Sequence, residues 1–513
     1  MKQAIIVIDI GMTNKKIAVY DEHLVQRESV YKEFSPIMIK GLSGDIPTHD
    51  IDGMKKWFIE NIRLFAKEYP VRAISVTAHG ATFVCVDERG SVCAPCIFYT
   101  YEPGEDFHRE FYEKCGSPES LQATTYTPQF PALLNYAKGI LFLQKYFADR
   151  FARTTVILGF PQYWSFWLTG KKAYEPTYLA CHSYLWNQNE HTWSTVVDSL
   201  GIRSRMPEIY VPTCNSLGCI SAQTAKELGL DESVIVTAGI HDSNASLLPY
   251  IARGSDKDFI LNSTGTWCVC MHPDVSENAK SFYNPDDIGK TVFFNRSALD
   301  TPVKTAIFVG GMEVDTYVRL YQKINKTDAF PVSDMQTVQK ILSEKRVFLV
   351  PGVLPESGVF PLSAAGIYED GIFYPLNEML SGKSVPKVFF NEKLFFALLD
   401  ISIAIQTETS VGCVGFSDTT SLYTEGGFRK NRLYNELLSS IFPSNSVALT
   451  TMKEATATGC AMSALMALTG KSCTELGDFI KIEHVPIKKT EINDYEAYKA
   501  AWLTAAQIKR EHV

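Results

Sequence analysis

The sequence has little of what marks several large classes of protein. Its 513 residues include 12 cysteines, too few for a fold built on disulfides. Asp and Glu (57) outnumber Lys and Arg (49), and the net charge of −8 argues against a nucleic-acid protein held by overall positive charge. No window approaches about 18 uncharged apolar residues, so we expect no membrane contact. The segment from Met1 to Asp9 is not a signal peptide, so we expect a cytoplasmic protein.

Several catalytic motifs are also missing. The chain has no Gly-x-x-x-x-Gly-Lys-Ser/Thr, which leaves a P-loop NTPase without support. It has no Gly-x-Gly-x-x-Gly after a predicted strand and no His-Glu-x-x-His, the motifs of dinucleotide enzymes and zinc hydrolases. Because Gly-x-Ser-x-Gly is absent as well, a hydrolase with a nucleophile elbow lacks its central feature.

The cysteines that are present include one close pair, Cys93 and Cys96. In a thioredoxin-like site a Cys-x-x-Cys opens a helix and carries redox chemistry. Here residues 87–90 predict a turn after a strand at 83–86, and no helix or second cysteine pair at zinc spacing follows. We expect buried or half-buried thiols, with a redox or metal role as the alternative.

The length and the apolar pattern predict an α/β protein. Dividing 513 residues by about 150 per domain suggests three domains and equally allows two large ones. Residues 4–8 form a β-branched run, 52–68 have helical spacing, and 71–77 predict another buried strand. A second strand–turn–strand pattern covers residues 259–271, so we expect two related halves with a boundary near 245–255.

Two turns carry residues suited to an anion. In the first turn (Asp9–Asn14), Gly11 permits a tight bend, and backbone N–H groups and the Thr13 hydroxyl can face a phosphate. Asp9 at the end of the preceding strand can hold a hydrated Mg²⁺. The second turn (Ser263–Thr266) offers similar donors. Each alone also fits an ordinary hairpin, but together the two can hold the phosphates of one nucleotide between two domains.

His241-Asp242 follows a predicted strand at 234–238 and Gly239. A carboxylate at the carboxyl end of such a strand lies at the usual ligand edge of an open α/β sheet. There Asp242 can accept the proton of a hydroxyl that attacks a phosphate. The alternative is that Asp242 caps the helix that follows.

Two further segments are rich in small residues. The glycine turn (Glu425–Asn431) follows a predicted strand, and its glycines allow a flat ring to approach the backbone. Residues 457–461 are similarly small. Either segment alone is also typical of close helix packing.

In this order, the segments resemble the FGGY carbohydrate kinases over essentially the whole chain. The matching segments are Ile8–Asn14, Gly239–Asp242, Ser263–Trp267, Phe348–Pro361, Gly426–Asn431 and Ala455–Gly459. The residues at His241-Asp242 and in the second turn look most like those of rhamnulokinases and fuculokinases. The resemblance implies two ribonuclease-H-like domains of the actin and hexokinase type with a central cleft. They would be residues 1–248, which are mainly sugar-binding and carry the first turn, and 249–513, which mainly bind ATP.

The resemblance also implies roles for individual residues. Asp242 would be the catalytic base and would also contact the sugar, and Asp9 would hold Mg²⁺. The residues expected at ATP are Gly11, Thr13, Asn14, Thr264, Gly265, Thr266, Gly426, Gly427 and Asn431. The further residues expected at the sugar are His79, Gly80, Glu175 and His241.

The reaction implied is phosphorylation by ATP of a ketose, such as the 6-deoxyketohexoses L-fuculose or L-rhamnulose, at a primary hydroxyl. Asn14-Lys15-Lys16 and residues 98–103 differ from the residues usual in the family at these places. The identity of the sugar is therefore left open. The alternatives are xylulose, ribulose, gluconate, glycerol or erythritol as substrate, or a non-catalytic nucleotide sensor of the same fold. The family often forms dimers, so a homodimer is a further expectation.

Overall fold

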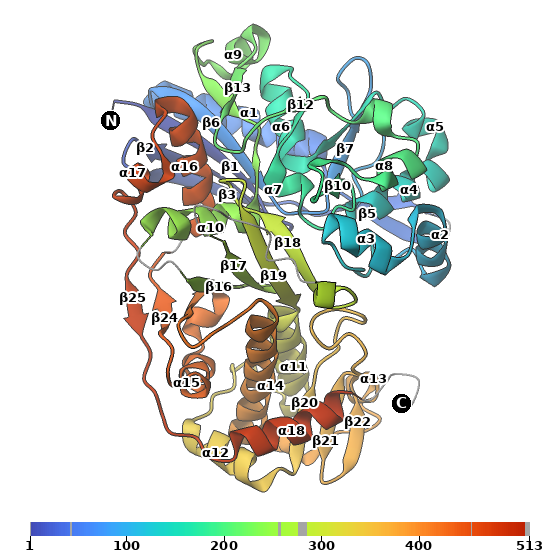
Figure 1. Cartoon of the computed structure of the whole chain (residues 1–513), viewed down its shortest axis with the longest axis vertical. Coiled ribbons are helices and arrows are strands. Elements are labelled where there is room, and N and C mark those ends of the chain that lie inside the picture. Colours follow the sequence, from blue (N-terminus) through green and yellow to red (C-terminus); the bar gives the residue numbers. More distant parts are fainter. Residues whose placement is uncertain (1, 42–43, 255–257, 275–284, 453, 508–513) are drawn as a thin grey trace.

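The computed structural model describes residues 2–41, 44–254, 258–274, 285–452 and 454–507. Two lobes lie one above the other along the long axis of the molecule, and each contains a seven-stranded mixed sheet (Figure 1). The N-terminus lies in the upper lobe of that view, and α18 (Tyr495–Ala506) lies in the lower one. The fold is the two-domain α/β architecture that the sequence predicts.

The upper sheet is built around β1, whose run of Ile and Val is almost entirely buried, as in a strand covered on both faces. Its strands are β1 (Ala4–Ile10), β2 (Asn14–Asp21), β3 (Gln26–Glu33), β6 (Val71–Ala78), β13 (Ser216–Cys219), β14 (Ile235–Thr237) and β15 (Ile240–His241). The order is β13-β14-β6-β1-β2-β3, with β15 beside β6. β1 pairs antiparallel with β2 and parallel with β6.

The lower sheet repeats this pattern. Its strands are β16 (Phe259–Thr264), β17 (Cys268–Pro273), β18 (Val292–Arg296), β19 (Pro302–Phe308), β23 (Ser421–Gly426), β24 (Val447–Thr450) and β25 (His484–Pro486). β16 pairs antiparallel with β17 and parallel with β23, as β1 does with β2 and β6. The internal repeat expected from the two strand–turn–strand patterns is therefore present in the strand pairing.

Helices from both halves of the chain lie between the two sheets. They are α10 (Asp242–Arg253), α16 (Ala455–Thr469) and α17 (Cys473–Gly477). α16 belongs to the C-terminal half, yet it packs on β1 and β6 of the upper sheet (Figure 1). A Cβ built on Gly459 would stand 1.8 Å from the Ala245 carbonyl oxygen, so this glycine lets α16 and α10 cross closely. The close-packing interpretation of residues 457–461 is confirmed, and the domain division at 248/249 stays a prediction.

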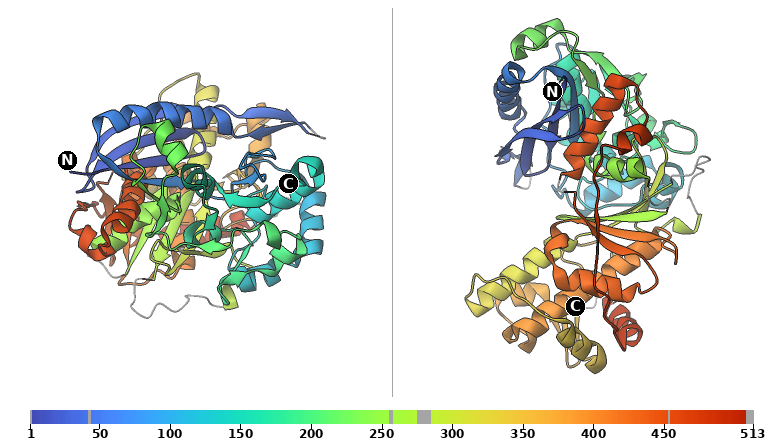
Figure 2. Two further views of the ribbon diagram at one scale, coloured as in Figure 1. Left: turned by 90° about the horizontal axis from the view of Figure 1, so that it is seen from above. Right: turned by 90° about the vertical axis from the view of Figure 1, so that its left-hand side faces the viewer.

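The outer faces are covered by helices and small sheets. In the upper lobe these are α1 (Ile51–Glu68), α2 (Glu105–Cys115), α3 (Pro118–Thr125), α4 (Tyr136–Tyr146), α5 (Ala148–Phe151), α6 (Phe160–Thr169), α7 (Pro176–Leu179), α8 (Thr195–Ser199) and α9 (Ala222–Leu228), with β4 (Ile37–Lys40), β5 (Asp45–Thr48), β7 (Phe83–Val86), β8 (Val156–Gly159), β9 (Ala173–Tyr174), β10 (Trp186–Asn187), β11 (Thr192–Trp193) and β12 (Ile209–Tyr210). In the lower lobe they are α11 (Gly310–Asn325), α12 (Met335–Glu344), α13 (Leu376–Ser381), α14 (Glu392–Cys413) and α15 (Arg432–Ile441), with β20 (Val347–Val350), β21 (Gly366–Glu369) and β22 (Ile372–Pro375). Figure 2 shows the two lobes from above and from the side.

Among the described residues, α14 is the one helix long and apolar enough to cross a membrane. Of its 18-residue apolar window, 83% is buried inside the protein. A core helix passes the same test of length and composition, so α14 is weak evidence for a membrane span.

The Cys-x-x-Cys pair is buried, as expected. The thiols of Cys93 and Cys96 are both free rather than joined in a disulfide. The Cys93 Sγ lies 3.4 Å from the Cys85 carbonyl oxygen, and the Cys96 Sγ lies 3.3 Å from the Phe83 carbonyl oxygen. Burial raises the pKa of Cys96, which opposes the thiolate that redox chemistry requires.

Candidate active site

Two cavities meet at the second turn. The larger, about 920 Å³, is lined by Gly265, Thr266, Gly311, Met312, Val314, Asp315, residues 330–333, Phe396, Gly427, Phe428 and residues 430–433. The smaller, about 300 Å³, is lined by Met12, His79, Gly80, Tyr99, Leu134, Cys181, His182, residues 241–243, residues 263–267, Val269, Phe293, Asn295 and Ile307. Gly265 and Thr266 line both. One short turn therefore separates a space of nucleotide size from a space of sugar size.

The first turn is held by a lysine that sequence reasoning treated as a departure. The backbone N–H of Gly11 donates to the Asn14 carbonyl at 3.0 Å and closes the bend. Lys15 is buried, and its ammonium donates to the carbonyls of Gly11 at 2.9 Å and Met12 at 2.7 Å. Thr13 and Asn14 remain exposed. The turn carbonyls thus already accept hydrogen bonds from Lys15, and the positive charge of its ammonium lies beneath the turn.

Asp9 ends β1 beside this turn and is half-buried. Burial raises the pKa of Asp9 to about 7, and although the nearby Lys16 ammonium opposes the rise, the charges of Asp242 and Glu454 add to it. A divalent cation relieves this kind of repulsion, and Mg²⁺ prefers oxygen ligands. The acidic groups around Asp9 therefore fit Mg²⁺.

The second turn is packed against two glycine segments. The Thr264 hydroxyl donates to the Glu425 carbonyl and accepts from the Phe428 N–H at 2.9 Å. A Cβ on Gly426, which has a positive φ of 81°, would stand 2.0 Å from the Thr264 carbonyl oxygen. A Cβ on Gly311 would stand 2.0 Å from the Gly265 carbonyl oxygen. We infer that the Thr264 side chain and both glycines hold the turn, and the contact of Thr264 with ATP stays a prediction.

The glycine turn leads into α15 through Asn431. The Asn431 Oδ1 accepts from the Tyr434 N–H at 3.1 Å and caps the helix. Its Nδ2 donates to Asp400 Oδ1 at 2.7 Å. Gly427 and Asn431 line the larger cavity, whereas Gly426 is not among its lining residues and pairs with Thr264 of β16. The Asn431 side chain is thus already engaged, and its contact with adenosine stays a prediction.

Asp242 is the first residue of α10 and lines the smaller cavity. The N-cap is His241, not Asp242, so the capping alternative for Asp242 differs from the structure by one residue. The Ser243 N–H donates to Asp242 Oδ1 at 2.6 Å, and the Asp242 side chain is 33% exposed. Burial raises the pKa of Asp242 to about 6, so the carboxylate is mostly ionised at neutral pH.

Three histidines line the smaller cavity. His79, His182 and His241 are each less than 9% exposed. Burial lowers the pKa of all three to about 3, so they are neutral at pH 7. The Nε2 of His79 has no hydrogen-bond partner among the described residues. Neutral imidazoles can donate to or accept from hydroxyl groups, which suits an uncharged polyhydroxylated ligand.

Glu175 is held by donors inside the protein. It is fully buried, and its carboxylate accepts from the backbone N–H groups of Thr177 at 2.9 Å and Tyr178 at 2.6 Å. The hydroxyls of Thr177 and Thr213 also donate to it at 2.8 Å. All of these contacts lie inside the protein, and Glu175 is not among the residues that line the smaller cavity. Thr177 in turn accepts from the His241 N–H at 3.0 Å, so Glu175 is linked to His241 through Thr177, and its contact with the sugar stays a prediction.

Sequence reasoning missed several lining residues. Gly310-Gly311 opens α11 after a strand, the same signal that marked the glycine turn, so the pair was detectable. Phe330 and Val332 are exposed apolar residues of a loop that borders the larger cavity, and no local pattern indicates them. Cys181 and His182 are far in sequence from His241, and only the fold brings them beside it.

The two lobes with repeated sheets have the architecture of the actin and hexokinase type, with a carboxylate in the smaller cavity and a turn shared by the two cavities. Residues 4–249 match the N-terminal domain of the FGGY family of carbohydrate kinases, and residues 256–472 match the FGGY C-terminal domain. The chain therefore belongs to the FGGY family of carbohydrate kinases, which are phosphotransferases.

The individual proteins that this chain resembles are named for different sugars. A rhamnulokinase from Halalkalibacterium halodurans is 28% identical over 51% of this chain and 52% of its own length, so the chain spans about half of that relative. A rhamnulokinase from Oceanobacillus iheyensis is 23% identical over 91% of this chain and 94% of its own. The crystal structure of a ligand-bound xylulose kinase from Lactobacillus acidophilus matches with a TM-score of 0.76 at 16% identity, covering 98% and 97% of the two chains. The last similarity shows the fold alone.

Proposed function

We propose that this sugar kinase transfers the γ-phosphate of ATP to a primary hydroxyl of a ketose, with a 6-deoxyketohexose such as L-rhamnulose or L-fuculose as the preferred acceptor. The observation that carries the proposal is the second turn shared by the two cavities, with Asp242 lining the smaller one. A phosphate held at Gly265 and Thr266 would face a hydroxyl beside Asp242. The choice of sugar is supported by the motif wording and by the two relatives named rhamnulokinase.

In the proposed mechanism, Asp242 accepts the proton of the sugar hydroxyl. The sugar oxygen forms a bond to the γ-phosphorus, the bond from that phosphorus to the β–γ bridging oxygen breaks, and ADP leaves. Because the transition state of phosphoryl transfer is loose, positioning and charge neutralisation contribute more than the strength of the base. A carboxylate with a pKa of about 6 is ionised at neutral pH and is still able to hold a proton transiently.

The two turns would hold the phosphates from opposite lobes. Gly11, Thr13 and Asn14 would contribute N–H and hydroxyl donors from the first turn, over the charge of Lys15. Gly265 and Thr266 would do the same from the second turn. Mg²⁺ bound with ATP neutralises phosphate charge, and Asp9 would hold that ion through its water shell.

The nucleoside would occupy the larger cavity. Gly427 and Asn431 line it, beside the apolar surface of Phe330 and Phe428. An apolar cavity with a few polar groups at one end is the usual setting for an adenine ring. The upper half of the chain, 1–248, would then mainly bind the sugar, and 249–513 would mainly bind ATP.

In the smaller cavity, His79, Gly80 and His241 would contact the sugar. All the imidazoles there are neutral, and none of the described residues lining that cavity is a Lys or Arg. An anionic acceptor such as gluconate would therefore lack a counter-charge, which favours a neutral sugar. Xylulose, ribulose, glycerol and erythritol remain as neutral alternatives.

The experiment that tests the proposal measures ADP release with a panel of ketoses and polyols at fixed ATP and Mg²⁺. We expect the highest kcat/KM with a 6-deoxyketohexose and the lowest with gluconate. If another sugar or polyol of the panel gave a higher kcat/KM than the 6-deoxyketohexoses, that compound would replace them as the proposed acceptor. ATP binding without turnover on any member would favour the alternative, a nucleotide sensor of the same fold. We further propose that the protein is cytoplasmic and homodimeric, the latter testable by sedimentation.

A further inference from the structure

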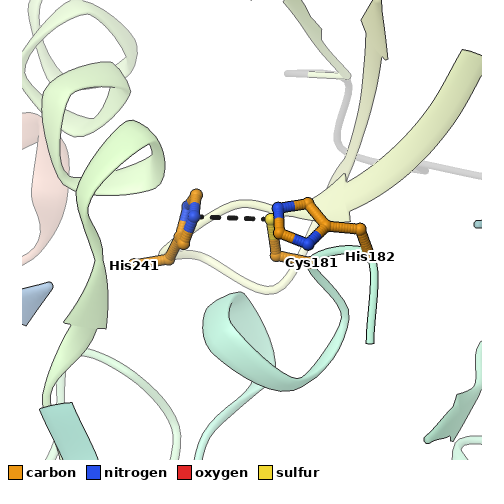
Figure 3. Close-up of side chains that lie close together, drawn as sticks. All are labelled: Cys181, His182 and His241. Carbon is orange, nitrogen blue, oxygen red and sulfur yellow. Dashed lines mark hydrogen bonds between the residues drawn. The ribbon is translucent and has the colours of Figure 1, made fainter. Parts of the chain in front are cut away.

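Three metal-ligating side chains converge at the wall of the smaller cavity (Figure 3). Cys181 and His182 follow α7, and His241 ends β15. Cys181 Sγ lies 3.4 Å from His241 Nε2, and one ligand atom of each residue lies within 4.8 Å of the other two. Tetrahedral zinc holds neighbouring sulfur and nitrogen ligands roughly 3.4–3.6 Å apart, as its bond lengths of about 2.3 and 2.0–2.1 Å require. One pair is already at that separation.

The environment of His182 leaves a nitrogen lone pair available. His182 Nδ1 lies 3.1 Å from the Leu134 carbonyl oxygen. Because a carbonyl accepts and never donates, Nδ1 carries the hydrogen and Nε2 keeps its lone pair. A backbone carbonyl behind the second ring nitrogen is the usual support for a metal-binding histidine.

The two imidazoles approach each other beside Gly80. A Cβ built on Gly80 would stand 2.7 Å from His241 Nε2 and 3.1 Å from His182 Nε2, so only a glycine lets both nitrogens lie this close to the backbone. Gly80 and both histidines line the smaller cavity, and Asp242 Oδ1 lies 3.4 Å from His241 Nε2.

We propose that Cys181, His182 and His241 form a binding site for Zn²⁺, separate from the Mg²⁺ that accompanies ATP. A thiolate and two imidazoles are the donors that zinc prefers, whereas Mg²⁺ takes oxygen ligands. On binding, the S–H bond of Cys181 breaks, a sulfur–zinc bond forms, and the proton passes to the buffer. Three protein ligands would leave one position of a tetrahedral ion for water or a ligand hydroxyl. No electron transfer is involved.

The zinc site overlaps the proposed sugar site, because His241 belongs to both. Bound zinc would therefore inhibit the kinase in competition with the sugar and not with ATP. This consequence rests on the proposed function, but zinc binding itself does not. The competing description is a thiol–imidazole hydrogen bond between Cys181 and His241 in a polar cluster that binds no ion.

The binding experiment uses the full chain, freed of metal with a chelator, without ATP or sugar. Zn²⁺ is titrated against a chromophoric chelator for the wild type, Cys181→Ser and Cys219→Ser. Cys219 is an exposed thiol on β13, so its variant controls for nonspecific binding by cysteine. We expect one strongly bound zinc in the wild type and in Cys219→Ser, and at least about tenfold weaker binding in Cys181→Ser. Equal binding in Cys181→Ser and the wild type would overturn the proposal.

Two further measurements keep the test decisive. If Cys181→Ser does not fold, Co²⁺ added to the wild type must give a thiolate-to-metal charge-transfer band, and absence of that band overturns the site. In the kinase assay, zinc should raise the KM for sugar and leave the KM for ATP unchanged, and a chelator should reverse this. Inhibition that is competitive with ATP instead would contradict the overlap. A protein that binds zinc but phosphorylates no sugar would leave the site intact and count against the proposed function.

Discussion

Replacing Gly311 with alanine tests whether close packing of α11 positions the second turn. The added Cβ would stand 2.0 Å from the Gly265 carbonyl oxygen and 2.8 Å from its carbon. Carbon atoms in contact are about 3.5–4.0 Å apart, so the turn or the helix must move by on the order of 1 Å. Because a misplacement of about 1 Å can cost 10²-fold in rate, we expect kcat/KM for ATP to fall by about that factor.

The assay measures ADP release at varied ATP and saturating sugar, together with titration of an ATP analogue, which needs no sugar. Gly412→Ala is the matched control, because it makes the same replacement within α14 and the new Cβ meets no atom within 4 Å. We expect Gly412→Ala to keep wild-type kinetics. Wild-type kcat/KM and nucleotide affinity in Gly311→Ala would refute the argument that this contact positions the turn.

Two other predictions concern buried charges. Lys15→Met removes the donor to three turn carbonyls, and a buried carbonyl left unpaired costs about 1–3 kcal/mol. We therefore expect a lower Tm and weaker ATP binding, and an unchanged melting curve would count against the role of Lys15. Burial raises the pKa of Asp400 from 3.8 to about 8. Between these two pH values the folded chain keeps a proton on Asp400 that the unfolded chain releases. The free energy of unfolding therefore falls as the pH rises from about 4 to about 8. Asp400→Asn does not titrate, so its Tm should fall less between pH 5 and about 8 than that of the wild type, and equal slopes would contradict this cause.

The strands that open the two sheets, β1 and β16, were predictable because their apolar residues form short runs next to turn residues, whereas β3, β18, β24 and β25 were not predicted. β1 and β16 each precede a turn rich in Gly and Thr, and this shared pattern was enough to predict the internal repeat. The place of α16 was not predictable in this way. Its small residues indicate close packing, but only the fold shows that the partner is α10.

The candidate site was predictable as a set of segments and less so as a set of atoms. The direction of a side chain depends on tertiary contacts that local sequence does not encode. Glu175 lies in the expected segment, yet five donors hold its carboxylate inside the protein. Thr264 and Asn431 likewise have side chains already engaged by the protein. Lys15 was the opposite case. It differs from the residue usual in the family, yet its ammonium donates to a carbonyl of the first turn.

The central claim is that Asp242 accepts the proton of the sugar hydroxyl beside the second turn. The most direct test is Asp242→Asn, which keeps the shape of the side chain and removes the base. We predict that ATP and sugar binding, measured by titration, stay close to wild type while kcat falls by a factor on the order of 10³ or more. Turnover close to wild type in this variant, with both ligands still bound, would contradict the assignment.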